Sequence, residues 1–127
     1  MTARALVLEI VTPDGRALLE AGVDAVVLRR RERRFEVGSE IAVFPRHAPT
    51  LVRLPIAPAR YRRDGVTVHL AVAGGFAEVR GDRVLVVTPR CERVPGGAPA
   101  PRAVAMATCR RWAEELRDFR AAMVGAR

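Results

Sequence analysis

The stretch Ala71–Thr88, AVAGGFAEVRGDRVLVVT, decides the fold class of this chain. Two runs rich in apolar and β-branched residues flank the polar turn RGDR at positions 80–83. Such runs on either side of a glycine-containing turn are typical of a β-hairpin. Gly74 and Gly75 stand just before Phe76, where a missing side chain permits a bulge or the close approach of a neighbouring strand. No helix start follows these glycines, so a bulge is favoured over a phosphate-binding loop.

Shorter runs of the same kind precede this hairpin. The segments between them contain turn residues, as in TPDG at 12–15 and DG at 64–65. Several short strands at spacings of about 8 to 12 residues, with turn residues between them, predict a β-sandwich. The strands expected before the hairpin cover residues 5–11, 16–20, 23–28, 40–44, 51–54, 59–62 and 66–72.

The C-terminal part of the chain follows a different pattern. Residues 94–101, VPGGAPAP, have the composition of a linker. Beyond them, apolar residues recur at alternating spacings of four and three, which places one apolar stripe along a helix. Either the sandwich or a partner chain must cover this stripe, and we favour the sandwich because isolated amphipathic helices are marginal in water. The stripe consists of Ala105, Cys109, Trp112, Leu116, Phe119 and Met123.

The sequence therefore predicts a mainly β protein with an N-terminal β-sandwich and a single C-terminal amphipathic helix. We expect the sandwich at residues 1–93, the linker at 94–101 and the helix at 102–127. A chain of 127 residues, half of them apolar, suits one domain with an appendage. No apolar run approaches the ~20 residues that cross a bilayer, and the N-terminus does not resemble a signal peptide, so we expect a cytosolic chain.

Arginine dominates the charge of this sequence. The formal net charge is +8, and all 22 basic residues are arginine. Five of them fall within residues 29–34, which we expect to form a solvated hairpin tip or loop. This charge favours an anionic neighbour: nucleic acid, lipid headgroups or an acidic protein surface. Nucleic-acid binding by a free-standing basic β-domain stays an alternative, although only Phe35 and Tyr61 are near enough to stack on bases.

Residues for catalysis or metal binding do not form a recognisable pattern. The two histidines and two cysteines show no motif that would hold a nucleophile beside a base. Cys91 and Cys109 form no CxxC pair and have no histidine at ligand spacing, which argues against a zinc site. We therefore expect no catalytic residues, no metal, no cofactor, and thiols that are reduced and structural.

Three segments, in the same order, resemble the epsilon subunit of the rotary F-type ATP synthase. They are LEIVTPDG at 8–15, EIAVFPRHAP at 40–49 and the hairpin at 71–88. The resemblance implies a β-sandwich on the foot of the central stalk, against the gamma subunit and the membrane rotor ring. It implies a non-catalytic coupling subunit of a hetero-oligomer, peripheral on the cytoplasmic face of the plasma membrane. Such a subunit serves ion-driven ATP synthesis or ATP-driven ion transport and has no nucleic-acid partner.

The resemblance also assigns roles to residues of the corner segment. Glu40 matches the acidic residue in the family's ring-facing corner, and His47 matches the histidine of its PGHAP sequence. Together with Arg46, these residues are expected to contact the rotor ring.

We also expect partners for two further segments of the chain. Gly74, Gly75 and Phe76 match a GGF-type segment of the family, which we assign mainly to sandwich structure, with contact to the gamma subunit as a second role. Near an anionic surface each arginine contributes about 1 kcal/mol before salt screening, so the arginine run is expected to reach anionic lipid headgroups or an acidic loop of the ring. The run consists of Arg29, Arg30, Arg31, Arg33 and Arg34.

This chain departs from the family pattern at several places. Ala42 and Arg46 stand where the family has glycines, and residues 29–34 resemble an insertion. Only one helix follows the linker, where the family usually has two, and no ATP-binding signature matches. The shortened tail resembles the epsilon subunit of the alternative, often sodium-translocating, ATPases. It implies that regulation of ATP hydrolysis by the tail is weak or lost.

Overall fold

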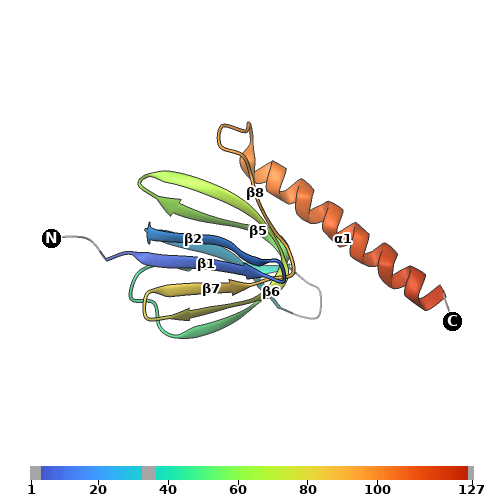
Figure 1. Cartoon of the computed structure of the whole chain (residues 1–127), viewed down its shortest axis with the longest axis horizontal. Coiled ribbons are helices and arrows are strands. Elements are labelled where there is room, and N and C mark those ends of the chain that lie inside the picture. The colour runs from blue at the N-terminus through green and yellow to red at the C-terminus, as the bar shows by residue number, and fades with distance from the viewer. Residues whose placement is uncertain (1–3, 33–36, 126–127) are drawn as a thin grey trace.

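The computed structural model describes residues 4–32 and 37–125, which form eight strands followed by one helix (Figure 1). The mainly β fold with one C-terminal helix confirms the fold class predicted from the sequence. The strands are β1 (Leu6–Thr12), β2 (Gly15–Val23), β3 (Ala25–Arg31), β4 (Val37–Val43), β5 (Thr50–Arg63), β6 (Val66–Arg80), β7 (Arg83–Val87) and β8 (Cys91–Arg93), and the helix is α1 (Pro101–Gly125).

The strands pair in the order β2-β1-β7-β6-β5-β3-β4, and β8 pairs with β6. The long strands β5 and β6 pair with each other over nearly their whole length and belong to both layers of the sandwich. In the first layer, residues 50–54 and 76–80 of these strands join β7, β1 and β2. In the second layer, residues 56–63 and 66–73 join β3, β4 and β8. β1 and β7 run parallel, and the other described pairs are antiparallel.

Two glycines mark the point where β6 passes from the second layer to the first. Gly74 and Gly75 have φ angles of 89° and 93°, in a region that residues with a side chain rarely adopt. A Cβ atom on Gly75 would collide with the carbonyl oxygen of Val87 on β7. The bend therefore favours glycine at both positions: Gly74 because of its φ angle, and Gly75 also because a side chain there would force β6 and β7 apart.

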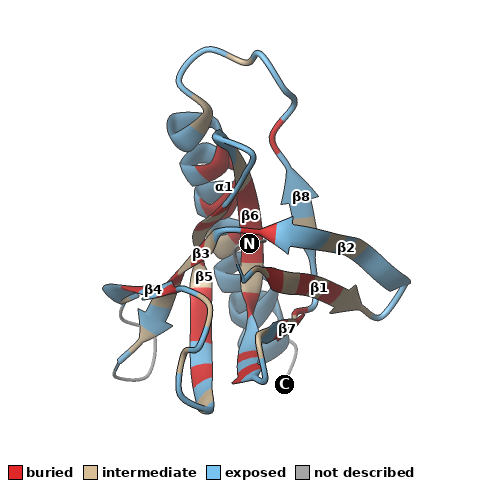
Figure 2. Ribbon diagram, turned by 90° about the vertical axis from the view of Figure 1, so that its left-hand side faces the viewer, coloured by how far each residue is buried: buried red, intermediate tan, exposed pale blue. Residues whose placement is uncertain are grey.

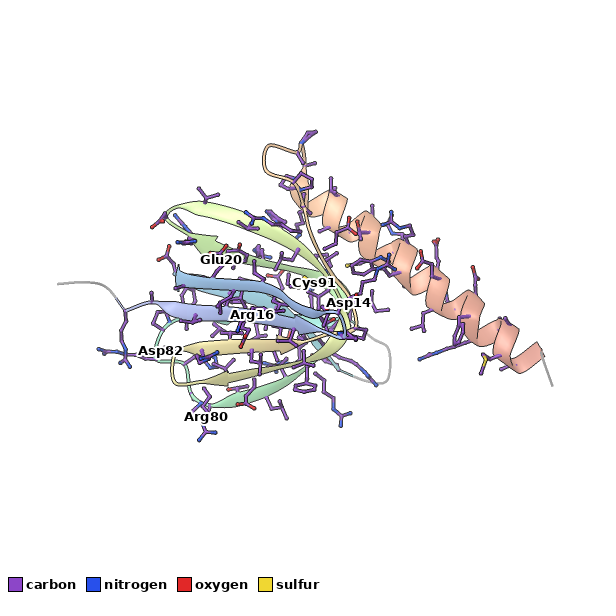
Figure 3. All side chains as sticks on the ribbon, in the orientation of Figure 1. Asp14, Arg16, Glu20, Arg80, Asp82 and Cys91 are labelled. Carbon is purple, nitrogen blue, oxygen red and sulfur yellow. The ribbon has the colours of Figure 1, made fainter. Side chains whose placement is uncertain are left out.

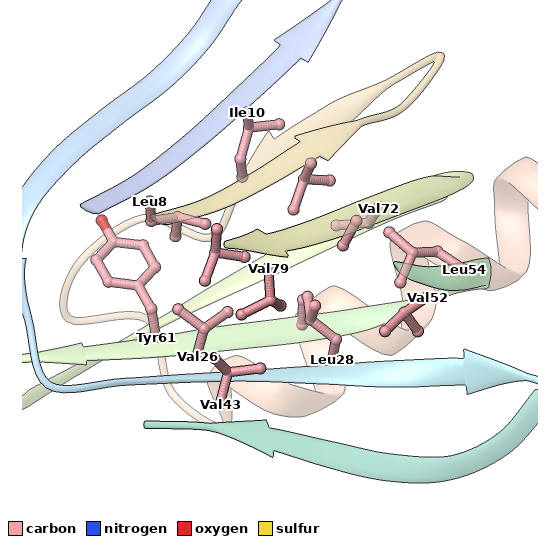
Figure 4. Packing of buried hydrophobic residues seen from close by; sticks show 14 of the residues in the cluster. Leu8, Ile10, Val26, Leu28, Val43, Val52, Leu54, Tyr61, Val72 and Val79 are labelled. Atoms are coloured by element: carbon pink, nitrogen blue, oxygen red, sulfur yellow. The ribbon is translucent and has the colours of Figure 1, made fainter. Parts of the chain in front are cut away.

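The core between the layers consists of alternate residues of the strands (Figures 2 and 4). In β1, for example, Leu6, Leu8 and Ile10 are buried and the residues between them are not. This alternation is the one expected of a strand that presents one face to a core. Tyr61 is the largest fully buried side chain, and burial raises the pKa of its hydroxyl group.

The strands β5 and β6 are longer than the sequence indicated. The prediction of separate strands at 51–54 and 59–62 is wrong, because β5 continues through Pro55 and Pro58. β3 pairs only with residues 60–62 of β5, so both prolines lie outside that pairing, where a residue without an N–H donor is tolerated. Likewise β6 continues through its two glycines, and the three-residue strand β8 was not predicted.

Part of the arginine run is strand. Arg29, Arg30 and Arg31 end β3, and Arg29 and Arg31 pair with β4, so the prediction of a solvated tip or loop is wrong for these three residues. The reason is that Arg29 lies opposite Glu40, whose carboxylate compensates its charge. Arg33 and Arg34 lie outside the described residues.

The helix α1 lies beside the second layer, and its far end extends beyond the strands (Figure 1). Cys109 and Trp112 pack with Ala71, Ile56 and Ala73 of β5 and β6. This packing confirms that the sandwich covers the first half of the stripe. α1 has no stretch apolar enough to cross a membrane. The division into a sandwich, a linker and a helix at the expected boundaries stays a prediction.

Candidate interaction surfaces

The outer side of the first layer is exposed to solvent, and we call it the open face. Leu51 and Leu19, at opposite edges of this layer, have exposed fractions of 68% and 47%. Residues directly opposite on paired strands form rows across a sheet. One row of the open face consists of Leu51, Glu78, Leu85, Glu9 and Leu19.

A second row crosses the open face beside the first, two residues away on each strand except β2, where a register shift makes the spacing three. In this row Phe76 is 43% exposed and lies between an arginine and a valine. Exposed aromatic and aliphatic side chains between arginines are typical of a protein–protein interface. The row consists of Arg53, Phe76, Val87, Val11 and Arg16.

The charges on the open face are held in place by one carboxylate. Glu9 accepts hydrogen bonds from Arg16 Nε at 2.9 Å and from Arg83 Nη2 at 3.0 Å. Arg80 points away from the sandwich (Figure 3). Ion pairs on a surface stabilise a fold by about 1 kcal/mol at most, so the main effect of Glu9 is to order the two arginines.

The corner that follows β4, at residues 44–49, is tied to the β6–β7 turn. The backbone N–H of Arg46 donates to Asp82 Oδ1 at 2.6 Å, and Arg4 Nε lies 2.8 Å from Asp82 Oδ2. Arg46 has a φ angle of 67°, which explains why a glycine would suit this position. The hydrogen bond to Asp82 therefore holds a strained loop against the end of the first layer.

His47 has a defined environment in the corner. Its backbone N–H donates to the carbonyl of Phe44 at 3.2 Å, and Nδ1 of its ring lies 2.8 Å from the carbonyl oxygen of Ala48. A carbonyl oxygen can only accept, so Nδ1 carries the proton and Nε2 is the basic nitrogen of the neutral ring. The corner thus presents an ordered histidine next to Phe44, which is 58% exposed.

Glu40 stands in a separate cluster of three arginines. Its carboxylate accepts two hydrogen bonds from Arg60, at 3.1 and 3.0 Å, and one from Arg102 at 3.1 Å, while Arg29 lies 3.4 Å away. The hydrogen bonds from Arg60, with the charges of all three arginines, lower the pKa of Glu40 against the opposing effect of desolvation. The cluster connects β4, β3 and β5 to the first turn of α1.

The structure separates residues that the sequence grouped. Glu40 is engaged with β3, β5 and α1, whereas Arg46 and His47 belong to the corner held by Asp82. Phe76 lies on the open face, while the two glycines before it form the bend of β6. The described residues therefore offer two accessible surfaces, the open face and the corner, that meet at the β6–β7 turn.

The described side chains form no reactive or metal-binding centre. No group of three His, Cys, Asp or Glu residues among them could hold a metal ion. Burial raises the pKa of the Cys91 thiol to about 11 and also raises that of Cys109. Both cysteines are free and stay protonated near neutral pH, which makes them poor nucleophiles.

The open face and the Glu40 cluster were not predicted from the sequence. Both depend on strand register, which brings together residues such as Leu51 and Leu19 that lie far apart in the chain. The alternation of apolar and charged residues within each strand was the available signal, but it does not show which strands are neighbours. The stacking of Arg90 over Trp112, at 4.7 Å from the ring centroid, was missed for the same reason.

Comparison with known proteins supports the same architecture. Residues 5–94 match the family model described as ATP synthase, Delta/Epsilon chain, beta-sandwich domain. The chain is 36% identical over 87 residues to the ATP synthase epsilon chain of Bacillus subtilis, covering 68% of this chain and 61% of that one. With the epsilon chain of Brevibacillus brevis it shares 35% identity over 101 residues, which cover 79% of this chain and 70% of that one.

Two solved structures have a similar fold. One belongs to the mitochondrial ATP synthase of Euglena gracilis, with a TM-score of 0.63, 21% identity, and coverage of 92% of this chain and 64% of that chain. The other comes from the central stalk and c-ring of the Tetrahymena thermophila mitochondrial ATP synthase, with a TM-score of 0.57, 14% identity, and coverage of 96% and 98%.

The match to the Bacillus epsilon chain thus spans about three fifths of that relative's length. The family model, at residues 5–94, covers all eight described strands, which lie between Leu6 and Arg93. The chain belongs to the Delta/Epsilon family of ATP synthase subunits, as an epsilon-type chain.

Proposed function

We propose that this chain is a non-catalytic subunit of the ATP synthase central stalk, which connects the gamma subunit to the membrane rotor ring. The observation that carries this proposal is the pair of adjoining surfaces on the first layer: the open face and the corner. A coupling subunit needs two binding surfaces on one stiff body, and a close-packed sandwich deforms little under load. In such an assembly the chain is peripheral, at the cytoplasmic face of the plasma membrane.

The gamma subunit is the proposed partner of the open face. Phe76 is exposed there beside further apolar side chains, and arginine and aromatic residues contribute strongly to protein interfaces. Gly74 and Gly75 act indirectly, because the bend they form sets the position of Phe76.

The rotor ring is the proposed partner of the corner. Arg46 and His47 occupy a loop fixed by Asp82, so little conformational entropy is lost when a partner binds them. Glu40 stays a predicted ring contact, although its three arginine partners give it a structural role first. The whole arginine run stays a predicted contact of an anionic surface, although Arg29 is already paired with Glu40. The run consists of Arg29, Arg30, Arg31, Arg33 and Arg34.

Binding of purified gamma subunit to the purified chain tests this proposal. Phe76→Asp places a charge in the middle of the open face, and we expect it to weaken binding at least about tenfold. Val66→Asp is the matched control, because Val66 is 62% exposed but lies at the start of β6, away from the open face. Absence of wild-type binding, or equal binding by the two variants, would contradict the proposal.

A further inference from the structure

His69 on β6 lies under the first half of α1. Residues two apart on a strand share a face, so His69 shares the outer face of the second layer with Ala71. Ala71 packs against Cys109 and Trp112 of the helix. The carbonyl oxygen of His69 accepts a hydrogen bond from the backbone N–H of Val94 at 2.9 Å. The sheet therefore holds this half-buried histidine in place on the face that α1 covers.

A cleft between this face and the helix places His69 among cationic side chains. The cleft has a volume of about 320 Å³. Arg60 lies directly opposite His69 on β5, and α1 contributes two further arginines. Glu40 is the one acidic side chain among the described lining residues, and three arginines already share its carboxylate. The cationic residues that line the cleft are Arg29, Arg60, Arg102 and Arg110.

A proton on the His69 ring adds a positive charge to this cleft. Desolvation lowers the pKa of His69, and the charges of Arg60 and Arg102 lower it further. Charges of the same sign repel one another more strongly in a partly buried cleft than they do in water. Because Arg102 belongs to the helix, this repulsion acts between the sheet and the docked α1.

The other ionisable groups near the cleft do not cancel this repulsion. Cys109 stays neutral near neutral pH, because burial raises the pKa of its thiol. Outside the lining, Arg62 of β5 lies opposite Thr67 and Glu92 of β8 lies opposite Ala71, on the same face of the sheet. The opposite charges of these two residues offset each other.

We propose that His69 makes the docking of α1 sensitive to pH, because a proton on its ring repels the arginines that the helix brings into the cleft. While α1 is docked, the proton must enter a partly desolvated site beside Arg102. When α1 is released, water reaches the ring and the arginines of the helix move away from it. Acid therefore favours release of α1, independently of the proposed role in the central stalk.

The direction of the pH dependence follows from the two states of His69. Its pKa is lower with α1 docked than the ordinary value of 6.5, which it regains when the ring is exposed. Docking is therefore strongest above the pKa of the released state. It weakens as pH falls through that value toward the lower pKa of the docked state.

Hydrogen exchange of the purified full chain, followed by mass spectrometry, tests the inference. Amides in residues 101–112 of α1 exchange in proportion to the released fraction, because an isolated helix is marginal in water. His69→Gln is the variant to compare, since glutamine stays neutral. The ratio of the wild-type rate to the variant rate at each pH removes the intrinsic pH dependence of exchange. We expect this ratio to rise at least threefold between about pH 7.5 and about pH 5.5.

Two further measurements assign the effect to His69. The chain has two histidines, and His47 lies in the corner, so His47→Gln is the matched control and should exchange like the wild type at every pH. Glu40 does not contribute in this range, because its pKa is lowered from 4.5. Nuclear magnetic resonance of the His69 ring, identified by its absence from His69→Gln, should give a titration midpoint below 6.5.

Three outcomes would overturn the inference. The first is a ratio of exchange rates between the wild type and His69→Gln that stays constant with pH. The second is that His47→Gln abolishes the acid-induced increase in exchange as completely as His69→Gln does. The third is a midpoint for the His69 ring at or above 6.5, because protonation would then not oppose docking.

Discussion

The two outer faces of the sandwich differ in the size of their apolar side chains. On the second layer, Ala71 and Ala73 leave room for α1 to approach, and Trp112 fills the space between helix and strands. On the open face, Leu51 and Phe76 project into solvent with no described element above them. Small residues thus allow one face to be covered from within the chain, while the bulky residues of the other face stay exposed to solvent.

The largest effect is expected on the second layer, the face that α1 covers. Trp112→Ala should lower the free energy of unfolding by about 3 to 5 kcal/mol, because it removes the aromatic side chain that joins α1 to β5 and β6. Trp112→Phe should cost less than about 1.5 kcal/mol, since the indole Nε1 has no hydrogen-bond partner to lose. Urea unfolding followed by circular dichroism measures both. A loss below about 1 kcal/mol for the alanine variant would show that α1 is not docked.

The second prediction concerns the bend that the two layers share. Gly75→Ala should destabilise the fold by about 2 kcal/mol, because its Cβ would meet the carbonyl oxygen of Val87. Gly74→Ala is the matched control, with a similar φ but Leu54 O at an ordinary 3.5 Å from the new atom, and should cost about 1 kcal/mol. Equal losses in urea unfolding would mean that strain in φ, rather than the collision, dominates at both positions.

The third prediction concerns the charged contacts of the covered face, because the Glu40 cluster joins α1 to the second layer. Glu40→Gln should lower stability by about 1 kcal/mol at neutral pH, whereas Glu92→Gln on β8 should change it by less than about 0.5 kcal/mol. The pKa of Glu40 is lowered by folding from its ordinary value of 4.5.

The lowered pKa of Glu40 determines how stability depends on pH. The contribution of Glu40 is fully present above the pKa of the unfolded chain and is lost as pH falls through the lower pKa of the folded chain. Thermal unfolding from pH 7 down to about pH 3 should therefore bring the wild type and Glu40→Gln closer together. A difference in melting temperature between the two proteins that widens as pH falls would contradict the lowered pKa of Glu40.

The smallest effect is expected at the corner, next to the open face. Arg46→Gly should raise stability by about 0.5 kcal/mol, because glycine adopts a φ of 67° without strain. Arg53→Gly, in extended backbone on the open face, should instead lower it. A small rise in melting temperature for the first variant and a fall for the second would agree with this expectation.

The fold class was predictable because alternation and turn residues are local signals. The run from Ala71 to Thr88 predicts its hairpin from neighbouring residues alone, and the spacing of the stripe predicts α1. The continuity of β5 was not predictable, because the tolerance for Pro55 depends on where β3 stops pairing. Local sequence does not carry that information.

The candidate surfaces were predictable only in part. The corner could be found from its proline-flanked histidine, but its attachment to Asp82 depends on a residue 36 positions further along the chain. The engagement of Glu40 by Arg102 similarly joins positions 62 residues apart. Such contacts follow from the packing of layers, which no run of residues shows by itself.

The parallel pairing of β1 with β7 determines the order in which the chain can assemble. Val7 lies opposite Arg83, with most of the sandwich sequence between them. Closing so long a loop costs entropy before its contacts compensate, whereas β5 and β6 are joined by a short turn at residues 64–65. We therefore expect the β5–β6 hairpin to form first. On the ribosome, β1 can pair with β2 as soon as β2 has emerged, but its pairing with β7 must wait until β7 has been synthesised.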